Sequence, residues 1–212
     1  MSDYLGDLHK FSVHTNNNLE DLLDSGQRFD IVVSADVTIS RPNLLRAERK
    51  GDLVNQAFYY DGKTLTLYDP DAKVYATEPA PDTVEGMLDF ARSSLGLLVP
   101  AADLIYRNVH PLLMEGVTSA IRVGKSVIGG VICNHLAFSR PDVDFQVWIS
   151  DSGNPLPYKY VVTDTGNPAR VSISTVMSNW VVEPAVADTS FTFSPPEGSS
   201  RITFMRLDAG SN

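Results

Sequence analysis

The chain has 212 residues, of which 43% are hydrophobic and 20% charged, so it is long enough to bury one sizeable core. Its 26 acidic and 17 basic residues give a net charge of −9, which argues against binding to a nucleic-acid backbone. No apolar run approaches the ~20 residues of a membrane-spanning helix, and one cysteine, Cys133, excludes an internal disulfide. Met1 is followed by polar residues, so no signal peptide is expected within the chain.

The first forty residues predict a short helix followed by two strands. Asp3–Lys10 is expected to form one or two helical turns, with Ser2 as the N-cap. Strands are expected at Phe11–Leu23 and Phe29–Ser40. In the second strand, apolar residues alternate with polar ones and define a buried face: Ile31, Val33, Ala35, Val37 and Ile39.

Residues 44–79 predict an antiparallel continuation of the sheet. Leu44–Lys50 is expected to pair with Leu53–Tyr60. Phe58–Pro79 then has the pattern of three short strands joined by turns at Asp61-Gly62 and Asp69-Pro70-Asp71. The period of two in its middle strand indicates one apolar face, which another element must cover.

Thr83–Glu115 is predicted to be a helical insert in this sheet. A helix capped by Asp82 or Thr83 is expected to run to about Ser94, with Gly96 as its C-terminal stop. Shorter helical pieces are expected at Ala101–Tyr106 and Pro111–Glu115. The apolar residues of the main helix recur every three or four positions, which predicts one face packed on the sheet: Val84, Met87, Leu88, Ala91 and Leu95.

Beyond residue 116 the strand pattern resumes. Turn signals rich in Gly, Pro, Asn and Asp separate five predicted strands: Ala120–Ile128, Val131–Ser139, Val143–Ser150, Leu156–Thr163 and Arg170–Trp180. Their spacing of roughly 8–12 residues is typical of an antiparallel sandwich or barrel. With about ten or eleven strands and no linker, residues 1–212 are predicted to form a single domain.

Two sequences imitate catalytic motifs without completing them. Gly124-Lys125-Ser126 resembles the end of a phosphate-binding loop, but Ser119 stands where that motif needs a glycine. Ser126 also lacks the glycine of a nucleophile elbow, because Ile128 occupies that position. A hairpin is the better interpretation, and no catalytic residue is predicted.

Metal and cofactor binding are not predicted either. No two of the four histidines are three or four residues apart. Cys133 and His135 share one strand face and could meet one ligand, but a structural pair is favoured, with Cys133 a small buried residue.

Aromatic residues are concentrated on the predicted strands. They are Phe58, Tyr59, Tyr60, Tyr68, Tyr75, Phe138, Phe145, Trp148, Tyr158 and Tyr160. They are expected to form either plain sheet core or the wall of an apolar pocket.

A series of short motifs, from residue 4 to residue 204, resembles a family of predicted periplasmic bacterial proteins of unknown function. The motifs are R-P-N-L-L-R-A-E, F-Y-Y-D-G-K-T-L-T-L-Y-D-P, G-V-I-C-N-H-L-A-F, P-D-V-D-F-Q-V-W-I, L-P-Y-K-Y and F-T-F-S-P-P-E-G. More distantly, the first two and the last are similar to the outer-membrane lipoprotein carrier and receptor proteins (LolA/LolB-like). The resemblance implies a mainly β fold: a strongly curved, unclosed antiparallel β-barrel with the helical insert on its concave face.

The resemblance also implies a periplasmic or outer-membrane-associated location, with a secretion signal upstream of Met1. The expected function is non-enzymatic binding of an apolar ligand, namely an acyl chain, a lipid or a lipidated polypeptide. The alternative is a protein-binding envelope sensor or scaffold. The expected partners are therefore a lipid or lipidated protein, or another envelope protein, and not nucleic acid.

A ligand would need one apolar cavity of ~300 Å³ or more between insert and sheet. The predicted early wall is Val33, Val37, Phe58, Tyr60, Leu65 and Leu67. The predicted later wall is Leu136, Phe138, Val147 and Ile149. The predicted lining from the insert is Met87, Leu88, Leu104, Leu112 and Leu113.

Overall fold

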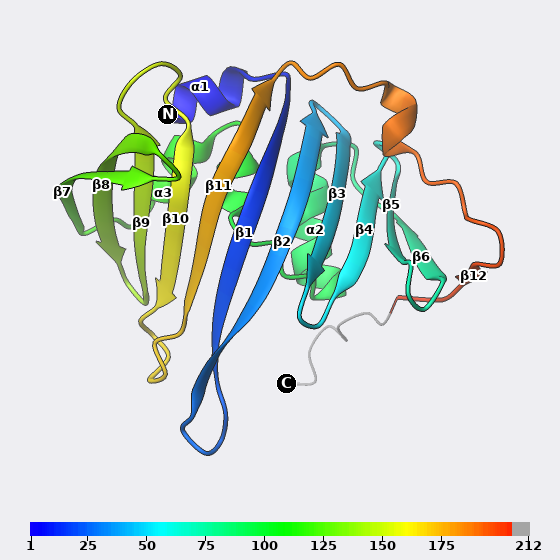
Figure 1. Ribbon diagram of the computed structural model, residues 1–212, viewed down its shortest axis with the longest axis horizontal. Helices are drawn as coiled ribbons and strands as arrows, with labels where there is room; N and C mark the ends of the chain where they lie inside the picture. The colour runs from blue at the N-terminus through cyan, green and yellow to red at the C-terminus, as the bar shows by residue number, and fades with distance from the viewer. Residues whose placement is uncertain (205–212) are drawn as a thin grey trace.

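The computed structural model describes residues 1–204 and shows one twelve-stranded sheet curved around a set of helices (Figure 1). The strands lie in the order β12-β6-β5-β4-β3-β2-β1-β11-β10-β9-β8-β7, so β12 and β7 are opposite edges and the sheet does not close. Neighbours in the described chain are antiparallel except β12 and β6, which are parallel. The predicted fold class is confirmed.

The strand bounds follow the predicted ones closely. They are β1 Lys10–Leu22, β2 Arg28–Ser40, β3 Leu44–Gly51, β4 Asn55–Tyr60, β5 Thr64–Asp69, β6 Val74–Pro79, β7 Ser119–Ile128, β8 Val131–Arg140, β9 Val143–Ser150, β10 Pro157–Asp164, β11 Ser172–Val182 and β12 Ser200–Arg201. The count exceeds the predicted ten or eleven because β12, a two-residue strand, adds to the edge of β6. So short a segment carries no alternation from which a strand is predicted.

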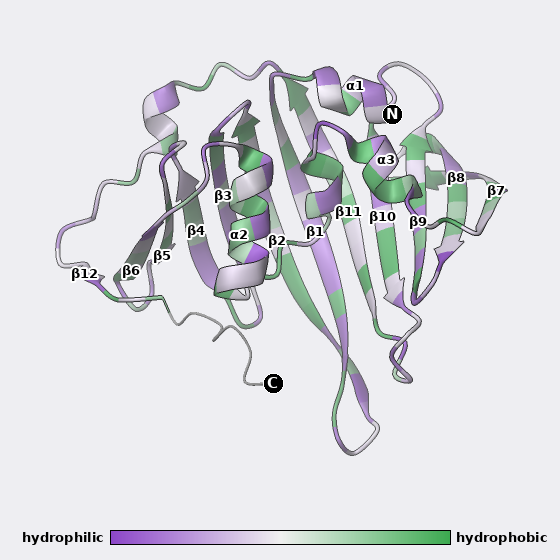
Figure 2. Cartoon of the chain, turned by 180° about the vertical axis from the view of Figure 1, so that it is seen from behind, coloured by the Kyte–Doolittle hydropathy of each residue, from purple (hydrophilic) through white to green (hydrophobic). Residues whose placement is uncertain are grey.

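The main helices cover the concave face, as the view from behind shows (Figure 2). The helical elements are α1 Ser2–Asp7, α2 Val84–Leu95, the 3₁₀ turn η1 Ala102–Ile105, α3 Val109–Met114 and the 3₁₀ turn η2 Asp188–Phe191. No helix within residues 1–204 is both long and apolar enough to cross a bilayer.

Helix α2 has the predicted caps and buries the predicted face. The Thr83 side chain accepts a hydrogen bond from the Gly86 backbone N–H at 3.1 Å, and Gly96 ends the helix with φ +63°. Its five apolar residues at three- and four-residue spacing are all buried. By contrast, Ser2 is not the N-cap of α1, because that helix begins one residue earlier than expected and Met1 precedes it without a side-chain bond.

A buried arginine ties the helices to the sheet. The Arg41 guanidinium donates to the carbonyls of Leu8, at 3.1 Å, and of Ile105, and forms an ion pair with Glu85 at 3.1 Å. Glu85 also accepts from the Arg107 backbone N–H at 3.1 Å. Burial lowers the pKa of Arg41 while Glu85 opposes that shift, so the charge is retained through its partners. This network joins α1, the β2–β3 turn, α2 and η1.

The segment after β11 runs along the upper edge of the sheet to η2 and then down to β12 (Figure 1). Phe193 lies there among Tyr59, Tyr68 and Tyr75, with ring centroids 5.1–5.5 Å apart. These three tyrosines were expected in the core or in a pocket wall. They lie instead on the outer face, where the C-terminal segment covers them.

The concave face carries two groups of buried residues. The α2 cluster includes Leu5, Phe11, Ile39, Leu45, Phe58, Tyr60, Leu65, Val84, Met87, Leu88, Ala91 and Leu95. The α3 cluster includes Val13, Leu104, Val109, Leu113, Phe145, Val147, Tyr160 and Met177. One sheet thus supports two differently packed regions.

Candidate functional site

An apolar cavity of about 290 Å³ lies between the helical insert and the concave face of β1–β5 and β11. Side chains from α2 (Met87, Leu88 and Ala91), residues 97–101 and η1 line its helical side. The sheet contributes alternate residues of β1 and β2, with Leu45, Ala47, Phe58 and Leu65 from β3–β5 and Met177 and Trp180 from β11. We call this space the main cavity.

The side chains at the centre of the floor are too short to fill the main cavity. The apolar face of β2 points into it, with Val33, Ala35 and Val37 at its centre. Ala47 lies opposite Val37 on β3 and faces the same way. Native cores leave few voids larger than a water molecule, so a space of this size beneath a packed helix is unusual for core packing alone.

A polar strip crosses this otherwise apolar floor. The Asn17 side-chain amide donates to Thr15 Oγ1 and to the Val33 carbonyl, both at 3.0 Å. Its Oδ1 accepts from Thr175 Oγ1 at 2.9 Å. All three side chains are buried, and their mutual bonds satisfy them without a ligand.

Arg49 joins the sheet to the irregular segment at the rim of the main cavity. Its guanidinium lies 4.9 Å from the Phe58 ring centroid, and its Nε donates to Gln56 Oε1 at 2.9 Å. A longer bond of 3.4 Å runs from Nη1 to the Leu98 carbonyl. Burial lowers the pKa of Arg49, and the ring and the amide oxygen compensate for the lost hydration.

A second cavity of about 180 Å³ lies on the other side of residues 97–101. These five residues and Leu88 line both cavities, so they form a shared wall. The lining found only in the second cavity is more polar and includes Arg92, Asp103, Tyr160 and Thr175.

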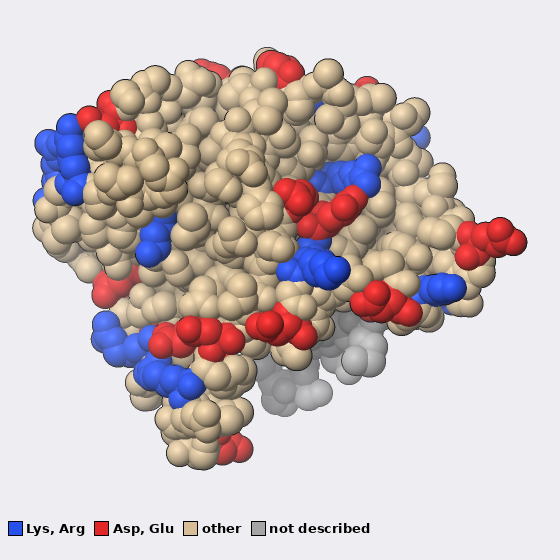
Figure 3. All heavy atoms as spheres, viewed as in Figure 1, with Lys and Arg blue, Asp and Glu red and all other residues tan. Residues whose placement is uncertain are grey.

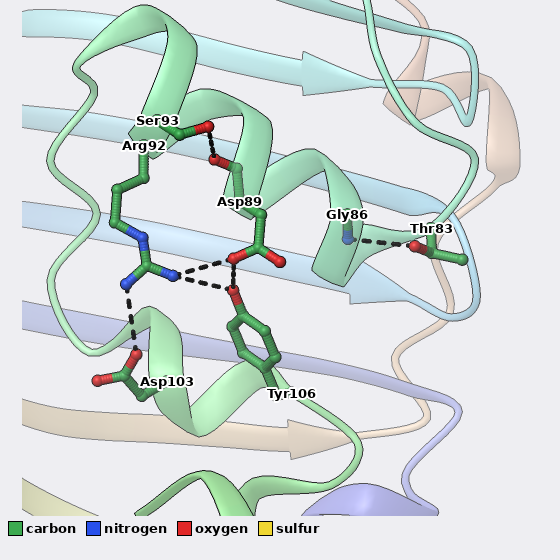
Figure 4. Close-up of polar contacts among 7 residues, drawn as sticks. All are labelled: Thr83, Gly86, Asp89, Arg92, Ser93, Asp103 and Tyr106. Carbon is green, nitrogen blue, oxygen red and sulfur yellow. Dashed lines mark hydrogen bonds and ion pairs between the residues drawn. The ribbon is translucent and has the colours of Figure 1, made fainter.

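A polar clamp holds the two ends of this wall together (Figure 4). Asp89 Oδ1 on α2 accepts from the Tyr106 hydroxyl at 2.6 Å and from Arg92 Nη2 at 3.1 Å. Arg92 Nη1 lies 3.8 Å from Asp103 Oδ1 in η1. Burial, followed by the bond to Asp89, raises the pKa of Tyr106, so this phenol stays protonated and donates. The clamp fixes α2 relative to η1 across the intervening segment.

Comparison of the sequence with family profiles identifies the family of this chain. A profile described as "Predicted periplasmic protein (DUF2092)" matches residues 1–205. The chain belongs to this family. The expected family is therefore confirmed, and its description is that of a predicted periplasmic protein. No curated protein matches the chain significantly.

Several solved structures are similar to this DUF2092 protein. An uncharacterized conserved protein from Thermus thermophilus has a TM-score of 0.54 at 10% identity, covering 95% of this chain and 94% of that one. LprF from Mycobacterium bovis has a TM-score of 0.52 at 16% identity, covering 94% and 93%. A LolA superfamily protein from Nitrosomonas europaea has a TM-score of 0.44 at 12% identity, covering 91% and 94%. At these identities the likeness of the first two concerns the fold alone.

The main cavity brings together seven of the predicted site residues: Val33, Val37, Phe58, Leu65, Met87, Leu88 and Leu104. The other predicted residues lie outside its lining. Tyr60 is fully buried in the α2 cluster, with its hydroxyl donating to the Pro81 carbonyl, and Leu67 packs against the same cluster. Leu112 is half-buried on α3. The remainder belong to or pack against the α3 cluster: Leu113, Leu136, Phe138, Val147 and Ile149.

Some cavity residues were not predicted from the sequence. They come mainly from β1 (Phe11, Val13, Thr15, Asn17 and Leu19), from the wall at residues 97–101, and from β11 (Met177 and Trp180). The alternation of Phe11, Val13 and Thr15 in β1 indicates that these three side chains share the inward face of the strand. The polar residues that follow it obscured the inward face.

Cys133 and His135 share one face of β8, as predicted, but make separate contacts. Cys133 is fully buried, and its Sγ lies 3.5 Å from the Val131 carbonyl. The His135 ring stacks on Trp148 at 3.9 Å, and its Nε2 lies 2.9 Å from Gln146 Oε1. Among the described residues no group of three or more His, Cys, Asp or Glu could hold a metal ion. The Ser126 hydroxyl, in the β7–β8 hairpin, accepts a hydrogen bond from Trp148 Nε1 of β9 at 3.0 Å.

Proposed function

We propose that this protein binds an apolar ligand in the main cavity without catalysing a reaction on it. The ligand class is an acyl chain, a lipid or a lipidated polypeptide, and the place of action is the periplasm or the periplasmic side of the outer membrane. The observation that carries the proposal is the apolar space of about 290 Å³ that lies between α2, the wall at residues 97–101 and the sheet.

The chemistry of the lining supports this ligand class. Burying a hydrocarbon chain gains ~0.8 kcal/mol per CH₂, so an apolar space binds it without any charged recognition group. The volume lies near the lower end of ~300–1,000 Å³ for small-molecule sites, which fits a single chain better than a bulky ring system.

The main cavity suggests a specific blocking substitution. Ala35 lies on β2 between Val33 and Val37 and faces the cavity, so Ala35→Phe should fill space that the ligand requires. A fluorescent fatty-acid probe is expected to bind the wild type, and this variant to weaken binding at least about tenfold, or ~1.4 kcal/mol. Leu67 is not suitable for this purpose, because it lies outside the lining.

The matched control is Val32→Phe, which places the same ring on the opposite face of the same strand. Val32 is 50% exposed, so the added ring meets solvent and probe affinity should stay at the wild-type value. Failure of the wild type to bind any acyl probe would overturn the proposed function. Native mass spectrometry of protein purified from its own host would identify a co-purified lipid.

A second candidate, a protein-binding scaffold, is favoured by the exposed edge strand β7. Its outer backbone edge has no neighbour in the described sheet, and Ile121, Val123 and Val127 are each more than half exposed. Such an edge can pair with an extended segment of another protein. Charged side chains of both signs lie on the outer face (Figure 3). On this alternative, Ile121→Lys would abolish partner binding and leave the fatty-acid probe unaffected.

A further inference from the structure

Tyr160 carries a buried hydroxyl group that the protein does not use. It lies on β10 in the α3 cluster, lines the second cavity, and is only 2% exposed. Its Oη is buried and has no hydrogen-bond partner among the described residues. Leaving a buried polar group unpaired costs stability, so such a group suggests a missing partner.

The hydroxyl is chemically a donor. Burial raises the pKa of Tyr160, Asp103 raises it further, and Arg140 only partly opposes them, so the phenol is neutral at physiological pH. A neutral phenol donates one hydrogen bond, and its best partner is an acceptor oxygen. The partner need not carry a charge, and in a dry site a neutral carbonyl is less costly to bury than a carboxylate.

The second cavity is a neighbour of the main one and shares lining residues with it. Both use Leu88 and residues 97–101 as a wall. Their floors also adjoin, because Asn17 in the main cavity and Thr175 in the second are direct partners across β1 and β11. A ligand whose chain lies in the main cavity would have to pass this Asn17–Thr175 contact, beneath residues 97–101, for its polar end to enter the second cavity.

We propose that Tyr160 donates a hydrogen bond to the carbonyl oxygen of an acylated ligand whose hydrocarbon chain occupies the main cavity. This inference rests on the proposed function and narrows it to acyl esters, amides or acids, as opposed to plain hydrocarbons. Arg92 and Asp103, which form an ion pair at 3.8 Å and line the same cavity, lie where the remaining polar part of the ligand would meet solvent.

The test compares two probes of similar length, methyl decanoate and undecane, by their displacement of a fluorescent fatty-acid probe. Tyr160→Phe should weaken methyl decanoate binding about two- to tenfold, the range expected for one net hydrogen bond, and leave undecane binding unchanged. Ligand-free Tyr160→Phe should melt at the wild-type temperature or above it, because the removed hydroxyl has no partner among the described residues.

The matched control is Tyr158→Phe, the same chemical change two residues away on β10. Tyr158 packs against the α2 cluster and lines neither cavity, so neither probe should change. Equal loss for both probes in Tyr160→Phe, a matching loss in Tyr158→Phe, or a destabilised ligand-free protein would overturn the inference, since each points to packing. Unchanged ester binding in Tyr160→Phe would overturn it while leaving the proposed function intact. Absence of binding by both probes to the wild type would overturn both.

Discussion

The two halves of the concave face differ in the size of the side chains that point inward. Under α2, the centre of the floor consists of short residues such as Ala35, Val37 and Ala47, and the main cavity remains. Under α3, large rings occupy the equivalent level, and the smaller second cavity lies beside one of them, Tyr160. Phe138 stacks on Phe145 with centroids 4.8 Å apart, and Phe145 lies 6.3 Å from Tyr160. No residue of β7–β10 lines the main cavity.

This difference shows that a side chain can point to the concave face without bordering a space that a ligand could occupy. Both halves alternate with a period of two, so both present one apolar face to the helices. The volume of the inward side chains then decides whether the helical cover closes on a filled core or on a cavity. The predictions below test this contrast, from the largest expected effect to the smallest.

The half of the sheet under α2 should not tolerate a buried charge, although it borders the main cavity. Leu88 is 4% exposed and lines both cavities, so Leu88→Asp places a carboxylate in apolar surroundings without a partner. We expect a loss of roughly 3–5 kcal/mol in the free energy of unfolding, measured by urea denaturation. Ser93→Asp introduces the same charge on the exposed side of α2 and should cost less than about 1 kcal/mol. An unchanged melting temperature for Leu88→Asp would show that α2 is not packed on the sheet.

The two halves should differ in the stability that an added ring costs. Val147 is 2% exposed within the α3 cluster, so Val147→Phe overfills it and should cost about 1–3 kcal/mol. Ala35→Phe enters the main cavity and should change stability by less than about 0.5 kcal/mol. Chemical denaturation of both variants gives the comparison directly. Equal costs would mean that the two halves are equally well filled.

The fold could be predicted almost completely because local signals in the sequence agree with one another. Asp61-Gly62 forms the expected turn, with Asp61 Oδ1 accepting from the Lys63 and Thr64 backbone N–H groups at 3.0 and 2.8 Å. The cap and apolar spacing of α2 likewise gave its bounds within a residue. What the sequence did not indicate was the outer cover by Phe193, which depends on a segment without regular periodicity.

The site could be predicted only in part, for a physical reason. Alternation places Val33 and Leu136 alike on an inward face, yet only Val33 borders the main cavity. Which inward residues border a space depends on how α2 and α3 sit on the sheet, and the Arg41 network sets part of that placement through partners 33 to 64 positions away in sequence. Contacts over such separations leave no periodic signal in the chain. The single-domain organisation and the ligand assignment stay predictions.

The smallest effect is expected on the outer face of the filled half, at Cys133. Burial raises the pKa of its thiol, which therefore stays protonated and is a poor metal ligand or nucleophile. His135 is already stacked on Trp148 and bonded to Gln146, so its ring is held in place by structural contacts. Cys133→Ser should leave acyl-probe binding unchanged, cost only about 1 kcal/mol of stability, and leave the zinc content after dialysis at background. Stoichiometric zinc in the wild type that is lost in this variant would overturn the structural role of Cys133. It would show a metal site in the half of the sheet under α3.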